Sequence, residues 1–168
     1  MLRFPSRRLQ ALRDLDLLDR PVEDRFTDLV LVARHLFEMP MVSITLLDEK
    51  RQWRLSYSGD LDRETPLEGS ICATAMVGGT SFVIDDLRLD ARYQDNPFVL
   101  GEPFLRFYAG HPLHAPDGEP LGVMCVMDVV PRHLRPRQLQ DLLDVTHAVE
   151  REIARTDPSA AAARRGAS

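Results

Sequence analysis

Two nearly continuous apolar segments near the C-terminal end constrain the fold most. Residues 105–113 and 121–127 each have the composition of a β-strand, and the turn residues Pro116, Asp117 and Gly118 lie between them. This arrangement predicts a β-hairpin, whose two strands are antiparallel in one sheet. Strands without alternation of polar and apolar residues are typical of a sheet covered on both faces. The hairpin therefore predicts helices or loops packed above and below an antiparallel sheet.

Three segments have the apolar spacing of amphipathic helices. They are residues 8–18, a segment that Pro21 opens and whose apolar stripe reaches Phe37, and the segment that follows Pro136. A shorter helix of one or two turns is expected over residues 70–77. The three long helices are the elements that can cover one whole face of a sheet.

Further strands and one long loop complete the order of elements. Residues 41–47 and 52–57 predict a second hairpin, and residues 81–84 predict a short strand. The loop 85–103 is rich in Asp, Pro and Gly, and loops longer than about 12 residues tend to be functional. The order predicts an α+β fold (an α/β sandwich) with a central antiparallel sheet of five to six strands. The terminal helices are expected on one face, and the short helix and long loop over a pocket on the other.

Length, charge and cysteine content limit the possible functions. The 168 residues suit a single domain, 1–155, with a disordered or linker-like tail, 156–168. A net charge of −5 opposes a phosphate-binding surface, so no nucleic-acid partner is expected. No apolar run reaches the roughly 18 residues that span a bilayer, so we predict a soluble, cytoplasmic protein with no membrane partner. The spacing of Cys72 and Cys125 matches no metal-ligand pattern, and no metal site is expected.

Seven short motifs occur in a consistent order between about Leu9 and Ile153. They are Arg51-Gln52-Trp53, Glu64-Thr65-Pro66, Ser70-Ile71-Cys72-Ala73, Asp90-Ala91-Arg92-Tyr93, Asp95-Asn96-Pro97, Arg106-Phe107-Tyr108-Ala109-Gly110 and Leu121-Gly122-Val123-Met124-Cys125-Val126-Met127-Asp128. Together they resemble the GAF family, in particular the subgroup found ahead of histidine kinase and diguanylate cyclase domains. The resemblance implies a ligand pocket roofed by the short helix and long loop, and homodimers formed through the first and last helices.

The resemblance also implies a regulatory role, and we predict a sensory domain that is not an enzyme. Family members bind different small molecules, and this sequence lacks the signatures of the cyclic-nucleotide and bilin binders, so the ligand and any cofactor stay unidentified. No kinase or cyclase sequence follows the last helix. The domain is therefore expected to stand alone and to signal to a separate partner such as a kinase or cyclase.

The candidate ligand-binding residues come from strand ends and the short helix: Trp53, Cys72, Phe82, Arg106, Tyr108 and Cys125. Arg106 and Tyr108, two apart on one strand, would point to the same side and offer a cation and a phenol to an anionic ligand. Alternatively, Arg106 pairs with an aspartate of the loop or with Asp128 and pins the loop to the sheet. The second interpretation is favoured, because structural ion pairs also gather beside clefts.

Two other functions stay open. One is a dimerisation or interaction scaffold, whose pocket is filled by its own side chains and whose terminal helices bind a kinase or another copy. The other is a thiol-based redox sensor, or an enzyme similar to the GAF-fold free methionine-(R)-sulfoxide reductase, with Arg106 favouring a thiolate. That enzyme relies on three cysteines, whereas here only Cys72 lies near an equivalent position. Inert packing of Cys72 and Cys125 is therefore favoured.

Overall fold

A six-stranded antiparallel sheet forms the centre of the computed structural model, which describes residues 4–156 and 166. The strand order is β3-β2-β1-β6-β5-β4. The strands are β1 (Met41–Leu47), β2 (Arg51–Ser58), β3 (Glu64–Pro66), β4 (Phe82–Ile84), β5 (Phe107–His114) and β6 (Pro120–Asp128). Every neighbouring pair is antiparallel, which confirms the predicted α+β fold and its central sheet.

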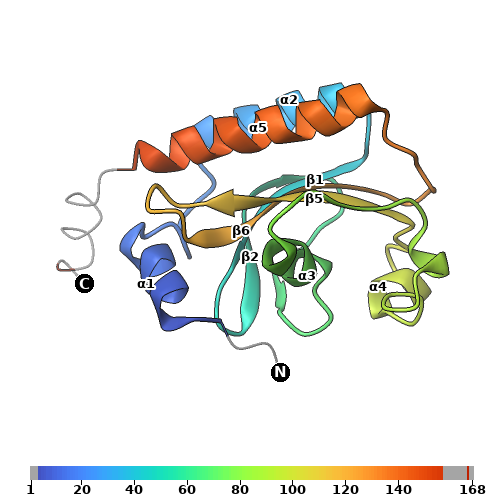
Figure 1. The fold of residues 1–168 in the computed structure, drawn as a ribbon, viewed down its shortest axis with the longest axis horizontal. Coiled ribbons are helices and arrows are strands. Elements are labelled where there is room, and N and C mark those ends of the chain that lie inside the picture. The colour runs from blue at the N-terminus through green and yellow to red at the C-terminus, as the bar shows by residue number, and fades with distance from the viewer. Residues whose placement is uncertain (1–3, 157–165, 167–168) are drawn as a thin grey trace.

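Helices and the long loop cover both faces of the sheet. Figure 1 shows α2 (Asp24–Phe37) and α5 (Pro136–Ala154) side by side across one face. On the other face lie α3 (Ile71–Gly78) and the segment with the 3-10 turn η1 (Leu87–Leu89) and α4 (Pro97–Leu100). The two-sided covering was predicted, but the helix that pairs with α5 is α2, while α1 (Ser6–Asp14) packs beside the turn of the β5–β6 hairpin.

The covering of both faces explains why the central strands are apolar throughout. Along β6, Met124 and Val126 belong to the cluster beneath α2 and α5, whereas Val123, Cys125 and Met127 belong to the cluster beneath α3. Side chains alternate across a strand, so each face receives every second residue. All five side chains are buried, and no position of this strand segment is left for a solvent-facing residue.

The first helix ends earlier than its apolar spacing predicts. It stops at Asp14, and Asp16 and Asp19 have left-handed backbone conformations, with φ of 51° and 61°. A helix cannot continue through such residues, although Leu15 and Leu17 beyond it still pack into the core. The leucine spacing therefore predicted correctly which residues are buried, but its prediction of the helix length was wrong.

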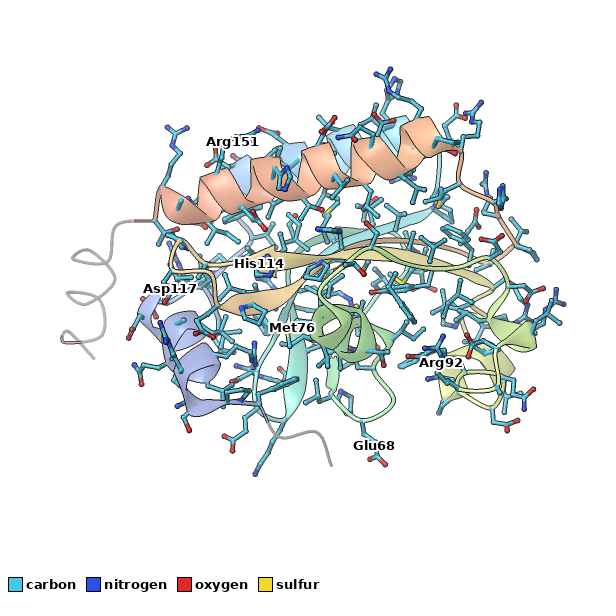
Figure 2. The ribbon with its side chains drawn as sticks, in the orientation of Figure 1. Glu68, Met76, Arg92, His114, Asp117 and Arg151 are labelled. Carbon is cyan, nitrogen blue, oxygen red and sulfur yellow. The ribbon has the colours of Figure 1, made fainter. Side chains whose placement is uncertain are left out.

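Arg8 fastens α1 to the sheet. Its side chain is 1% exposed, and its guanidinium donates hydrogen bonds to the carbonyl oxygens of Leu47, Pro120 (3.2 Å) and Leu121 (3.4 Å). Met76, which projects from α3 in Figure 2, brings its sulfur to 3.8 Å from the same guanidinium. Burial lowers the pKa of Arg8 to about 10. Three carbonyl partners offset part of the desolvation of this buried cation.

The predicted tail, 156–168, lies outside the described residues except for Thr156 and Gly166. Thr156 is buried and accepts a hydrogen bond of 3.1 Å from Arg25 on α2. In the part of the chain that the structure describes, no helix is long and apolar enough to cross a membrane.

Candidate functional site

A cavity of about 220 Å³ lies between the sheet and the segment 85–103, on the side of α3. The central strands form its floor, the loop after β2 and the start of α3 form its sides, and the end of the long loop forms its roof. Its lining comprises Thr45, Gln52, Arg54, Asp60, Leu61, Asp62, Thr65, Gly69, Ser70, Ile71, Cys72, Phe98, Glu102, Pro103, Leu105, Tyr108, Cys125 and Met127.

Side-chain hydrogen bonds hold the roof against α3. The Tyr93 hydroxyl donates to Thr74 Oγ1 at 2.7 Å, and the Asn96 side-chain amide donates to the Gly69 carbonyl at 2.9 Å. Asn96 also caps α4 by accepting from the Phe98 N–H at 2.9 Å. The roof is thus a defined part of the fold that encloses the cavity.

Strand β2 contributes two polar side chains to the cavity. Gln52 accepts a hydrogen bond from Ser70 at 2.7 Å and donates one to Thr65 at 3.0 Å. Ser70 in turn accepts from the Ala73 N–H at 3.0 Å and caps α3. This network positions the first turn of α3, which carries Cys72, over the floor of the cavity.

Arg54 is the buried cation of the site. The residue is 8% exposed, and its Nη1 donates to the Asp62 carbonyl at 2.6 Å and to Thr65 Oγ1 at 3.4 Å. Its Nε is buried and has no hydrogen-bond partner among the described residues. Asp60, Asp62 and Glu102 also line the cavity, but no described carboxylate lies within ion-pair distance of Arg54.

Cys72 from α3 and Cys125 from β6 meet at the cavity floor. Their sulfur atoms are 3.9 Å apart, both residues are buried, and both thiols are free. The Tyr108 hydroxyl on β5 donates a hydrogen bond to Cys72 Sγ at 3.2 Å. The hydrogen bond with Cys125 is the main cause that lowers the pKa of Cys72 to about 7, with smaller contributions from Tyr108 and the charge of Arg54. The pKa of Cys125 is raised by its hydrogen bond to Cys72 and by burial.

Comparison with known proteins decides the family. The model of the GAF domain matches residues 21–153. The chain belongs to the GAF domain family. The seven sequence motifs therefore indicated the family correctly. The cavity lies where the resemblance implied a ligand pocket, beneath the short helix and the long loop.

One sequence relative and two solved structures illustrate the range of proteins that this chain is similar to. A cyclic di-GMP phosphodiesterase of Pseudomonas aeruginosa is 43% identical over 119 residues, which are 70% of this chain and 20% of that protein. The GAF domain of an Acinetobacter phosphoenolpyruvate-protein phosphotransferase superposes with a TM-score of 0.66 at 17% identity, covering 90% of this chain and 95% of that one. The type II free methionine-R-sulfoxide reductase of Thermoplasma acidophilum gives 0.65 at 11% identity, covering 86% and 96%. At such identities the two structures share the fold with this GAF domain, and the match to the phosphodiesterase concerns a fifth of that protein.

Three of the six candidate ligand residues line the cavity of this GAF domain. They are Cys72, Tyr108 and Cys125. Phe82 packs edge-on against the Tyr108 ring, with 6.2 Å between the ring centroids, and supports the cavity wall from behind. Trp53 lies on the opposite face of the sheet, where it packs against the cluster beneath α2 and α5.

Arg106 fastens the roof through carbonyl groups. Its Nη1 donates to the carbonyl oxygens of Val99 at 2.9 Å and Leu105 at 3.0 Å. This contact corrects the expectation of an ion pair with an aspartate, because Asp86 and Asp90 instead pair with Arg88 and Arg92 beside them. The predicted role of pinning the loop is retained, but the acceptors are different.

Sequence reasoning missed the two polar residues of β2 that reach the cavity. Gln52 and Arg54 alternate with Trp53 and Leu55, and a period of two places the pairs on opposite faces. That alternation was the sequence signal that could have identified Gln52 and Arg54 as a pair on one face. It would also have placed Trp53 on the face opposite the cavity. Within residues 4–156 and 166, no group of three or more His, Cys, Asp or Glu side chains is arranged to hold a metal ion.

Proposed function

We propose that this GAF domain is a sensory, regulatory module that binds a small organic anion in the cavity beneath residues 85–103. The observation that carries the proposal is Arg54, a buried guanidinium whose Nε has no partner among the described residues. An unpaired buried charge is unfavourable, and a carboxylate is the planar partner that a guanidinium fork prefers. A bound anion would pair with the charge of Arg54 and supply the acceptor that its Nε lacks.

The size of the cavity limits the ligand. Its volume of about 220 Å³ compares with roughly 30 Å³ for a water molecule in the liquid. Pockets for drug-sized ligands span about 300–1,000 Å³. The ligand we propose is therefore a small metabolite and is smaller than a cyclic dinucleotide, although the Pseudomonas relative is named for its action on cyclic di-GMP.

Native mass spectrometry of gently purified protein, followed by denaturing analysis of anything released, tests the proposal. We expect the wild-type chain to retain an anionic small molecule and the Arg54→Met variant to lose it. Arg51→Met is the matched control, because Arg51 lies on the same strand but pairs with Asp19 outside the cavity, at 2.7 Å. Equal retention by all three proteins would refute the role of Arg54.

Binding through the outer helices is the second part of the proposal. On α2, Leu31, Val32 and Leu36 are 52%, 50% and 40% exposed; Val32 and Leu36, four positions apart, form one apolar stripe, and Leu31 lies on an adjoining part of the helix surface. Contiguous exposed apolar residues favour an interaction surface. We infer that this stripe joins two copies of the domain, and that the cytoplasmic output reaches a partner such as a kinase or cyclase through α2 and α5.

A further inference from the structure

The cavity floor contains a pair of thiols in a polar setting. Cys72 and Cys125 are the two cysteines of the chain, they are separated by 53 positions in sequence, and the fold brings their sulfurs to 3.9 Å. A buried free cysteine ordinarily behaves as a small apolar side chain. Here each sulfur has the other as a neighbour, and both residues, though part of the buried cluster beneath α3, also line the cavity.

The surroundings of the two sulfurs differ. Cys72 lies in the first turn of α3, accepts a hydrogen bond from Tyr108, and is close enough to Arg54 for the positive charge to favour its thiolate. Cys125 is fully buried in the middle of β6, and its pKa is raised. Cys72 therefore has the larger thiolate fraction and is the nucleophile of the pair, whereas Cys125 stays protonated.

We propose that Cys72 and Cys125 form a peroxide-reactive dithiol, in which Cys72 is oxidised first and Cys125 then closes a disulfide. The cavity gives the oxidant access to the pair, and its volume admits a hydroperoxide of a few heavy atoms. The proposal goes beyond ligand sensing and does not require an organic anion, since it depends on the two thiols and their neighbours.

Each step balances in atoms and electrons. The Cys72 thiolate attacks the terminal oxygen of a hydroperoxide; the S–O bond forms, the O–O bond breaks, and the leaving oxygen departs as an alcohol or as water after taking a proton. The Cys125 sulfur then attacks the Cys72 sulfenic acid; the S–S bond forms, the S–O bond breaks, and hydroxide leaves as water with the Cys125 proton. Two electrons pass from sulfur to the peroxide.

Intact-mass analysis of the reduced full-length chain after one equivalent of hydrogen peroxide tests the proposal. Under denaturing, non-reducing conditions we expect monomeric protein that has lost two hydrogen atoms and that dithiothreitol restores. At pH 7 the reaction should be at least about threefold faster than with urea-unfolded protein, because the larger thiolate fraction outweighs the lower nucleophilicity of a low-pKa thiol.

Single-cysteine variants separate the two roles. Cys125→Ala should stop at a sulfenic acid that dimedone traps, whereas Cys72→Ala should react no faster than unfolded protein. The wild-type mass and rate decide the proposal even if a variant fails to fold. A wild-type rate equal to that of the unfolded chain, or oxidation that yields only intermolecular disulfides, would overturn it. Disulfide formation by wild-type protein in which native mass spectrometry finds no bound anion would support this inference and count against the proposed function.

Discussion

Gly110 sets the position of the Tyr108 hydroxyl at the dithiol. A Cβ atom added at Gly110 would lie 2.6 Å from Tyr108 Oη and 2.7 Å from Val123 Cγ1, closer than carbon can approach either atom without displacement. Glycine at this point of β5 therefore leaves the space that the phenol occupies. The hydrogen bond from Tyr108 to Cys72 depends on this missing side chain.

Substitution Gly110→Ala should displace the Tyr108 hydroxyl from Cys72 and slow the reaction with peroxide. The expected decrease is severalfold, since the thiolate would lose a hydrogen-bond donor that favours it. The rate of loss of free thiol, followed with a thiol reagent, measures the effect. Gly78→Ala is the control: nothing lies within 4 Å of its added Cβ, so its rate should match wild type. Identical rates for both variants would argue against a role for Tyr108.

The reaction of Cys72 with peroxide should depend on pH in a range set by its lowered pKa. The groups that face Cys72 are the Cys125 thiol, the Tyr108 phenol and the Arg54 guanidinium, and the exposed carboxylates of the cavity rim are Asp60, Asp62 and Glu102.

We expect the rate to rise with pH through about 7 and then to level off, because the thiolate is the reactive form and its pKa is about 7. In unfolded protein the rise should be centred near the ordinary cysteine value of about 8.5. Stopped-flow measurements of both states across this range decide the point. Coincident profiles would mean that the fold does not activate Cys72.

Among the secondary-structure elements, the long apolar strands were predictable from sequence, as were the short α3 and β4, whereas β3, η1 and α4 were not predicted. The spacing located β1 at Met41–Leu47 and the two strands of the C-terminal hairpin within two residues of their ends. Strand β3 was not predicted, because three residues are too few to show an alternation of polar and apolar side chains. Only its pairing with β2 in the folded chain defines it. Of the residues that line the cavity, both cysteines and Tyr108 were among the candidates, but Arg54 was not, since the alternation along β2 indicates which face it lies on and not that it is buried.

Arg8 attaches α1 to the sheet by hydrogen bonds, beside the apolar contacts of the buried Leu9 and Leu12, and Arg8→Ala should therefore weaken the fold. We expect a loss of about 1.5–3 kcal/mol in the free energy of unfolding, the range for hydrogen bonds that involve a charged group. The substitution would leave three carbonyl oxygens without the donor they now share. Urea titration monitored by the fluorescence of Trp53, the single tryptophan, gives the value.

Its neighbour Arg7 provides the matched control. The Arg7 side chain is exposed and pairs with Glu119 at 2.9 Å, and exposed pairs contribute below about 1 kcal/mol. Arg7→Ala should thus lower stability less than Arg8→Ala. Equal losses would show that the helix as a whole, and not the Arg8 contacts, determines this part of the stability.

At the scale of the whole molecule, the sheet separates the cavity from the outer helices and also connects them. Cys125 on β6 faces the cavity, while Val126 beside it packs beneath α2 and α5. A change of position on one side of a strand is therefore transmitted to the packing on the other, because adjacent residues share one backbone. Occupancy or oxidation of the cavity can shift the helices only if it favours one of two arrangements.

The outer helices supply the last prediction, which concerns dimerisation. Val32→Glu places a charge in the exposed apolar stripe of α2, so it should weaken self-association by at least about tenfold, or 1.4 kcal/mol. Sedimentation equilibrium over a range of protein concentrations measures the dissociation constant. The rate of peroxide oxidation should stay unchanged in the same variant, since Val32 is exposed on α2, which covers the face of the sheet opposite the cavity.

Leu89→Glu is the control for this experiment, because Leu89 is 84% exposed and lies in the 3-10 turn on the opposite side of the sheet. If the stripe is the interface, the control should dimerise as the wild type does while Val32→Glu becomes monomeric. A wild-type chain that remains monomeric at every concentration, or equal weakening by both substitutions, would exclude the stripe. In the first case the cavity could act only within one copy, and a signal would have to leave α2 and α5 through a different protein.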